Sequence, residues 1–452
     1  MSPTCISLRF SHSIPRSKAT VLVMVLVAVT CSSVAWSQTQ TSTPQPTLKV
    51  KPQFFTAKDR QDAIRKATFY SAKAVGDVDI MAGPAQKDKD FQFHYNDTVT
   101  CEFVSPGQQM GGNTPKFLCN ILKVQTLDGQ VQTSDQIKDD PLKVKFGASN
   151  REVYAEIVSS RLLWALGFYT DAWYPIRVEC TNCPEDPETG SGARGPRTFK
   201  QASVVRKFAG HKMVESGKDD EGWSWKEFEQ LNGRPSYEKD SLKLMGAFIS
   251  HSDNKPPQQR LVCDNVNMDT STKPVTVTCT SSQMVVQDVG ATFGSGGLFT
   301  NNKTAKLNLH EWKDKPVWKK VGAVGDPNPP QCQASLQKSL TAKDGLENPT
   351  ISEEGRRFTA GLMCQLSDQQ ITDMFKLSRV YEMPEFHNDD GSYKNGMSED
   401  SIVQEWVTLF KEKREDVAKG RCQWKNQPAD LAVIDNPANL STVPNHCASK
   451  IY

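Results

Sequence analysis

The cysteines of the chain constrain its fold most, because they follow a segment that has the features of an export signal. Arg9 and Lys18 precede an apolar run over residues 19–30, and small residues follow as far as Ser37. A basic start, a short apolar stretch and small residues before a cleavage point are typical of a secretory signal peptide. We therefore expect a signal peptide over residues 1–37 and a mature chain that is secreted or periplasmic. The alternative is an uncleaved N-terminal anchor, although a membrane span needs about 20 apolar residues.

Two of the 12 cysteines lie in the signal segment, which leaves ten in the mature chain (12 − 2 = 10). An even number of cysteines in an exported chain predicts disulfide bonds. A zinc or redox site at the C-x-x-C pair is the alternative, but no second C-x-x-C accompanies it. The pairs that we expect are Cys101 with Cys119, Cys180 with Cys183, Cys263 with Cys279, Cys332 with Cys364, and Cys422 with Cys447.

Composition limits the class of partner. The chain is 37% hydrophobic and 23% charged, with a formal net charge of +2, which is typical of a globular protein. A nucleic-acid-binding protein usually carries a strong excess of positive charge, so we expect no nucleic-acid partner. No segment after the signal is apolar enough to predict a transmembrane helix.

Hydrophobic periodicity predicts an α+β protein in which strands come first and helices follow. The strands expected before residue 210 are 98–104, 116–124, 142–146, 173–178 and 198–208. The helices expected are 58–72, 150–166, 224–231, 239–250, 352–366, 367–379 and 398–418, with short strands between residues 259 and 290. Strands followed by helices suggest two lobes. The boundaries that we expect are a flexible leader over 38–57, an N-terminal extension and N-lobe over 58–210, a C-lobe over 211–420 and a C-terminal tail over 421–452.

Five charged positions are not explained by strand or helix packing. Lys145 lies in an apolar strand, and Glu156 lies inside the helix that follows. Asp253 and Lys255 share a polar loop after the next long helix, and Asp288 begins Asp-Val-Gly after an apolar strand. Each of these features alone is common on a solvated surface. Their order along the chain and their strand and helix context make a functional site the better interpretation.

In that order the residues resemble the protein-kinase-like superfamily. Residues 251–258, HSDNKPPQ, resemble the kinase catalytic loop HRDLKPEN, and residues 288–290, DVG, resemble the metal-binding DFG. With its export signal and cysteines, the chain is similar to the atypical secretory-pathway kinases. The resemblance implies a bilobal fold, with an N-lobe β-sheet plus one helix and a mainly helical C-lobe, stapled by disulfides. It also implies ATP and Mg²⁺ (or Mn²⁺) as cofactors, and a hydroxyl acceptor on a protein, a sugar or a lipid head group.

The resemblance implies a catalytic role for four residues. Lys145 would pair with the α- and β-phosphates and would be held by Glu156, which we prefer over Glu152 one turn earlier. Asp253 would accept the proton of the attacking hydroxyl, and Lys255 would lie near the transferred phosphate.

The resemblance further assigns the residues that hold the nucleotide and its metal. Asp288 and Gln258 would bind the metal ion. The residues assigned to nucleotide binding besides Lys145 are Gly107, Gly111 and Gly112 over the phosphates, and Val205 and Phe208 leading into the adenine-contacting hinge.

The chain departs from the kinase pattern in several places. Gln258 replaces the usual Asn, the glycine turn does not match G-x-G-x-x-G, and Asp288 follows Asp253 by 35 residues (288 − 253). Two alternatives therefore remain beside an active kinase. One is a catalytically inactive kinase-like module that binds a nucleotide or a protein, and the other is an unrelated secreted, disulfide-bonded binding protein.

Overall fold

The computed structural model describes residues 55–86, 91–105, 110, 114–133, 141–215, 222–269, 271, 276–294 and 306–425. The signal peptide, most of the leader, Cys447 and the three glycines Gly107, Gly111 and Gly112 lie outside the described residues. Within the described ranges, no helix is both long enough and apolar enough to cross a membrane.

The first half of the described chain forms a sheet that closes on itself. Its strands are β1 (Asp97–Val104), β2 (Lys116–Gln125), β3 (Val131–Thr133), β4 (Leu142–Phe146), β5 (Ala172–Cys183) and β6 (Gly195–Arg206). The strand order is β1-β5-β6-β4-β2-β3, and β1 also pairs with β2, so every strand except β3 belongs to a closed ring. The pairing of β1 with β5 is parallel, whereas β1 with β2 is antiparallel. The predicted strands are therefore present, and the closure of the sheet is an additional feature.

The closed sheet has its own hydrophobic core. Alternate residues of the strands, such as Val99, Phe117, Val144 and Ile176, are buried in one cluster, as expected for strands whose side chains point alternately to two faces. The disulfide of Cys101 and Cys119 joins β1 to β2, and that of Cys180 and Cys183 lies at the end of β5. Both pairs agree with the prediction from the sequence.

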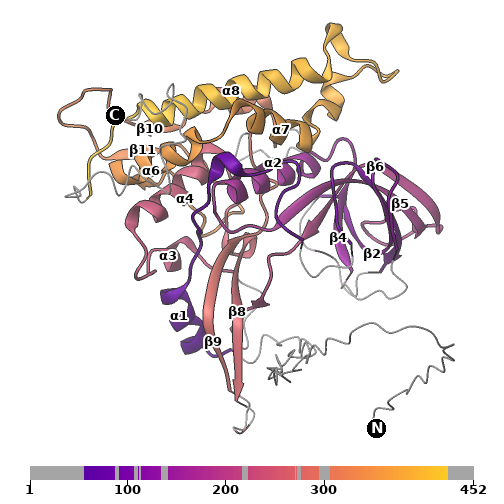
Figure 1. Ribbon diagram of the computed structural model, residues 1–452, viewed down its shortest axis with the longest axis horizontal. Helices are drawn as coiled ribbons and strands as arrows, with labels where there is room; N and C mark the ends of the chain where they lie inside the picture. Colours follow the sequence, from indigo (N-terminus) through magenta and orange to yellow (C-terminus); the bar gives the residue numbers. More distant parts are fainter. Residues whose placement is uncertain are drawn as a thin grey trace, which may run out of the picture. The chain divides into compact units, whose positions relative to one another are not determined.

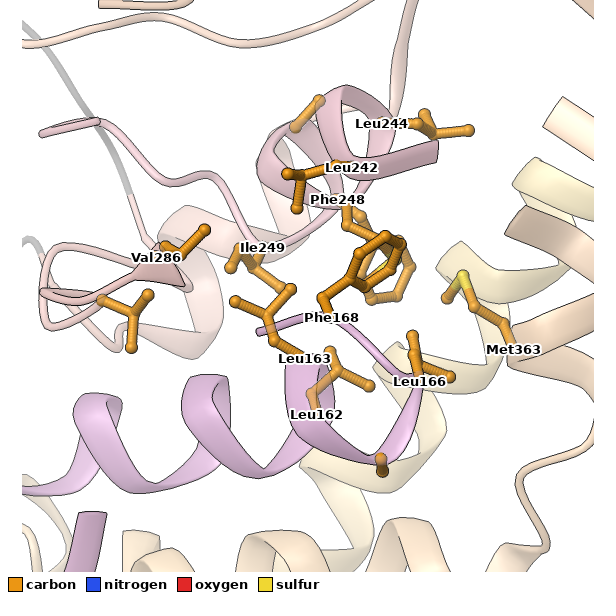
Figure 2. Close-up of a cluster of buried hydrophobic side chains, with 14 of the residues drawn as sticks. Leu162, Leu163, Leu166, Phe168, Leu242, Leu244, Phe248, Ile249, Val286 and Met363 are labelled. Carbon is orange, nitrogen blue, oxygen red and sulfur yellow. The ribbon is translucent and has the colours of Figure 1, made fainter. Parts of the chain in front are cut away.

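Helix α2 (Glu152–Ala165) follows β4, and nearly all of its side chains are buried. It contacts β5 on one side and α7 (Asp368–Ser378) on another. In its last turns Leu162 and Leu166 pack with Phe248 of α4 (Ser236–Phe248) and Met363 of α6 (Glu353–Cys364), as Figure 2 shows. A helix that is buried on every side tolerates charged residues only where they have partners.

The second half of the described chain is mainly helical around a long hairpin. Its further helices are α3 (Trp225–Phe228), α5 (Leu309–Asp314) and α8 (Glu399–Lys419), and its further strands are β7 (His211–Lys212), β10 (Trp318–Lys320), β11 (Cys332–Ala334) and β12 (Thr350–Ile351). Strands β8 (Gln259–Asp269) and β9 (Thr276–Val286) run side by side as the hairpin in Figure 1 and are joined by the predicted disulfide of Cys263 and Cys279. The polar loop of residues 251–258 precedes this hairpin, and the DVG segment follows it.

Helix α1 (Ala57–Lys66) packs against β9 and ends earlier than predicted. The expected end at residue 72 is wrong, because Thr68 and Tyr70 make isolated β-bridges with Gln283 and Phe168. Extended backbone at a β-branched residue and an aromatic residue fits their strand preference.

Two predicted disulfides are wrong. Cys332 bonds to Cys422, 90 residues away, so neither the pair of Cys332 with Cys364 nor that of Cys422 with Cys447 forms. The reason is a long-range contact in which the chain after α8 pairs with the approach to β11, where Gly322 bridges Arg421.

Candidate functional site

Lys145 is the centre of a buried group of charges. It lies on β4 between Lys116 of β2 and Ser203 of β6, and only 1% of the residue is exposed. Its Nζ lies 2.6 Å from Glu152 Oε2 and 3.6 Å from Asp288 Oδ1, and it also contacts Glu156 Oε1. The strand β4, the helix α2 and the segment after β9 thus meet at one ammonium group.

The two glutamates come from one face of α2, because residues four apart are neighbours on a helix. Both glutamates contact Lys145. From the sequence we prefer Glu156 alone as the carboxylate that holds this lysine, and in the structure Glu152 holds it as well. Glu152 Oε1 also contacts Lys306 Nζ, and its Oε2 accepts a hydrogen bond from Thr114 Oγ1 at 2.9 Å. Lys306 is 154 residues from Glu152, and no motif marks it in the sequence.

The DVG segment packs directly against α2. The backbone N–H of Val289 donates to Glu156 Oε2 at 3.0 Å. A Cβ on Gly290 would lie 2.9 Å from Glu152 Cγ and 3.0 Å from Glu156 Oε1. Glycine is therefore required at this position by the close approach of the two glutamates.

The loop of residues 251–258 lies beside Asp288. The ring Nε2 of His251 is 3.0 Å from the carbonyl oxygen of Asp288, and the N–H of Asp288 donates to the carbonyl oxygen of Gln258 at 3.3 Å. Asp253 Oδ1 lies 2.8 Å from Lys255 Nζ, while its Oδ2 accepts from Gln258 Nε2 at 2.9 Å. The loop therefore brings a paired carboxylate, a lysine and an amide next to the DVG segment.

Asn254 holds this loop in place. It is buried, its Nδ2 donates to the carbonyl oxygen of His251 at 2.6 Å, and its Oδ1 accepts from Trp225 Nε1 at 2.9 Å. A buried amide with these bonds fixes the loop backbone. No sequence pattern singles out Asn254, because its partner Trp225 lies on a separate helix, α3.

The buried charges divide into groups with raised and lowered pKa values. Burial alone would raise the pKa of Glu152, but the charge of Lys145, aided by Lys306, lowers it to about 2. Burial likewise opposes ionisation of Asp288, yet Lys145 holds the pKa of this carboxyl below its ordinary value. Burial raises the pKa of Glu156 well above its ordinary value, and the nearby charge of Asp288 adds to the rise although Lys145 opposes it. Perturbed carboxyls around one lysine are typical of functional sites.

The same carboxylates could hold a divalent metal ion. One oxygen each of Glu152, Glu156 and Asp288 lies within 4.8 Å of the others, and Mg²⁺ prefers oxygen ligands. The Asp288 side chain is 27% exposed whereas that of Glu156 is fully buried, so a metal ion would reach the group through Asp288. Gln258, which the resemblance assigns to the metal ion, donates from its Nε2 to Asp253 Oδ2 at 2.9 Å.

The remaining predicted site residues lie at the end of β6. Val205 is buried with Ile157 and Trp173, and the half-buried ring of Phe208 lies 5.1 Å from that of Tyr169. Val205 thus belongs to a packed cluster, while Phe208 keeps one partly accessible side.

Comparisons with family models, with curated proteins and with solved structures find no match for this chain.

Proposed function

We propose that the chain is an extracytoplasmic atypical kinase, which transfers the γ-phosphate of ATP to a hydroxyl group of a protein, a sugar or a lipid head group. The observation that supports this most is the meeting of Lys145, Glu156 and Asp288, with Lys145 Nζ 3.6 Å from Asp288 Oδ1. These residues come from three separate segments of the chain. A chance set of short motifs would have no reason to meet at one buried ammonium group.

The position of the site favours a two-lobed kinase arrangement. Val144, next to Lys145, belongs to the core of the closed sheet, whereas Val289, next to Asp288, belongs to the core of the helical part. The charged group thus lies between two hydrophobic clusters of one compact unit. In a kinase the nucleotide binds between two lobes, and we infer that these two clusters correspond to the lobes.

Each residue has a physical task in the proposed reaction. Phosphoryl transfer needs little covalent help, and mainly requires positive charge around the phosphates and a positioned hydroxyl. Lys145 would bind the α- and β-phosphates, and Asp288 would hold Mg²⁺, which neutralises charge on the phosphates when it is bound. Asp253 would accept the hydroxyl proton, and Lys255, 2.8 Å from it, would stabilise charge on the transferred group.

The test is transfer of label from γ-labelled ATP with Mg²⁺, offered protein, sugar and lipid head-group acceptors. Asp253→Asn should lower transfer by about 10²–10⁴-fold, the usual contribution of a general base, and Asp288→Ala should abolish it. Lys200→Met, an exposed position on β6, serves as the control and should transfer at the native rate. Transfer by Asp253→Asn at the native rate would contradict the assignment of the base.

A catalytically inactive nucleotide-binding module is the second candidate. It is favoured by the pairing of both carboxylate oxygens of Asp253, one with Lys255 and the other with Gln258, which leaves this carboxylate less available as a base. Binding of Mg-ATP without transfer to any acceptor, in the native chain and in Asp253→Asn alike, would decide for this candidate.

A further inference from the structure

We infer that Lys143 is a second phosphate-binding residue of the candidate site, beside Lys145. The inference rests on the proposed function and names a further binding residue for the same ligand. Lys143 lies on β4 two residues before Lys145, and side chains two residues apart on a strand point to the same face. The chemistry that it would recognise is a polyphosphate chain, either within a nucleotide or free.

Lys145 has little capacity left for a ligand. An ammonium group has three N–H donors. Two of them are taken by Glu152 Oε2, at 2.6 Å, and by Glu156 Oε1, and Asp288 Oδ1 lies 3.6 Å from the same nitrogen. At most one N–H of Lys145 is therefore open to a phosphate oxygen.

Lys143 keeps its whole charge for a ligand. The residue is half-buried, and within the described part of the chain its Nζ forms no ion pair and no hydrogen bond. The Nζ atoms of Lys143 and Lys145 each lie 5.2 Å from the centre of the Trp173 ring. The two ammonium groups are therefore at most twice this distance apart, a separation that a chain of two or three phosphates covers.

The more open side of the site is formed by Asp288 and Lys143. The Asp288 side chain is 27% exposed, whereas that of Lys145 is 2% exposed, so a ligand from solvent reaches Asp288 and the half-buried Lys143 before it reaches Lys145. Burial opposes ionisation of Asp288, but the charge of Lys145 and, next to it, the charge of Lys143 lower the pKa of this carboxyl. Lys143 is therefore near enough to Asp288 to act on the same bound phosphates.

Three lysines repel one another on this face of the sheet. Lys116 lies opposite Lys145 in the antiparallel pairing of β2 with β4, and like charges directly opposite each other destabilise a sheet. Burial lowers the pKa of Lys116, and the charges of Lys145 and Lys143 lower it further although Glu152 opposes them. A bound polyanion relieves this repulsion, and Lys143 is the member of the three that reaches it most directly from solvent.

The test is calorimetric titration of Mg-ATP into the native chain and into Lys143→Met, Lys143→Arg and Lys200→Met. Loss of a hydrogen bond to a charged group should raise the Kd of Lys143→Met by about 10–100-fold. Lys143→Arg, which keeps the charge, and Lys200→Met, at an exposed lysine of β6, should stay within about threefold of the native Kd. A native Kd in Lys143→Met would overturn the inference and leave the proposed function standing. Binding of neither Mg-ATP nor Mg-tripolyphosphate by the native chain would overturn both.

Two further measurements separate phosphate binding from other roles of Lys143. Because Lys143 has no carboxylate partner among the described residues, Lys143→Met without ligand should unfold at the same urea concentration as Lys200→Met, and a lower midpoint together with weaker binding would indicate a structural role and overturn the inference. Mg-tripolyphosphate has no nucleoside, so Lys143→Met should lose affinity for it by the same factor as for Mg-ATP. Native affinity for tripolyphosphate beside weakened ATP binding would place Lys143 at the nucleoside and also overturn the inference. If the native chain binds Mg-ATP alone, the ATP comparison decides, and Lys143→Gln takes the place of the methionine variant if the latter does not fold.

Discussion

Replacing Lys145 by methionine should destabilise the fold, because it removes the cation that three carboxyl groups share. Lys145 is 1% exposed and contacts Glu152, Glu156 and Asp288. Methionine has a similar volume and no charge, so the substitution changes the electrostatics of the site far more than its packing.

The size of the effect follows from Glu152 and from the burial of the group. A pKa of about 2 for Glu152 in the folded chain, against about 4.3 in an unfolded chain, corresponds to about 3 kcal/mol of stability at neutral pH. Breaking a buried ion pair by removing one partner typically costs about 3–5 kcal/mol. We therefore expect Lys145→Met to lower the free energy of unfolding by about 3–5 kcal/mol at pH 7.5.

The loss should depend on pH in a definite direction. Without Lys145, burial and mutual repulsion leave the folded-state pKa values of the three carboxyls above their unfolded values. Carboxyls with raised pKa values favour the folded state increasingly as the pH falls through those values. The difference between Lys145→Met and the native chain should therefore be smaller at pH 5 than at pH 7.5.

Urea denaturation under non-reducing conditions, followed by tryptophan fluorescence, measures the free energy of unfolding at pH 7.5 and at pH 5. Lys200→Met, on the exposed face of β6, is the control and should lie within about 0.5 kcal/mol of the native chain. If Lys145→Met matches this control in stability, or if its loss of stability grows on acidification, Lys145 does not neutralise the three carboxyl groups.

Three further predictions concern the surroundings of the site and the stability of the fold. Gly290→Ala should push α2 away and lower the midpoint of thermal unfolding, since its Cβ would lie 2.9 Å from Glu152 Cγ. Gly246→Ala in α4, whose Cβ would have its nearest atom at 4.0 Å, should leave that midpoint unchanged or raise it. Burial lowers the pKa of Lys413 to about 8, below its unfolded value, so the native chain should gain stability between about pH 8 and pH 10; Lys413→Met should lack this gain in denaturation curves taken at each pH. Replacing both Cys332 and Cys422 by serine opens a loop of 90 residues and should cost about 4.6 kcal/mol, whereas removing the three-residue disulfide at the end of β5 should cost about 1.6 kcal/mol by the same chain-entropy argument; equal losses in urea denaturation would refute it.

Much of the local structure could be predicted from the sequence because it depends on neighbouring residues. The strand with Lys145 and the helix with Glu156 follow from short-range periodicity, and the disulfides of Cys101 with Cys119 and Cys263 with Cys279 span hairpins. The meeting of Lys145 with Asp288 was expected only from the order of the motifs, and the contact agrees with that expectation.

Features that depend on distant segments could not be predicted. The parallel pairing of β1 with β5, which helps to close the sheet, joins Val99 to Val178 and has no local pattern. The disulfide of Cys332 with Cys422 likewise joins segments 90 residues apart, and no local pattern predicts it. The ion pair of Asp171 with Arg260 also joins residues 89 positions apart, and periodicity gives no reason to connect them.

The most direct test of the central claim is a calorimetric titration of Mg-ATP into the native chain, into Asp288→Ala and into Lys200→Met. If Lys145, Glu156 and Asp288 form a site for a nucleotide and its metal ion, the native chain and Lys200→Met should bind Mg-ATP with the same Kd. Asp288→Ala should lose this binding, and removal of Mg²⁺ from the native chain should have the same effect. Equal binding by the native chain and by Asp288→Ala, or no binding by the native chain at millimolar Mg-ATP, would contradict the account.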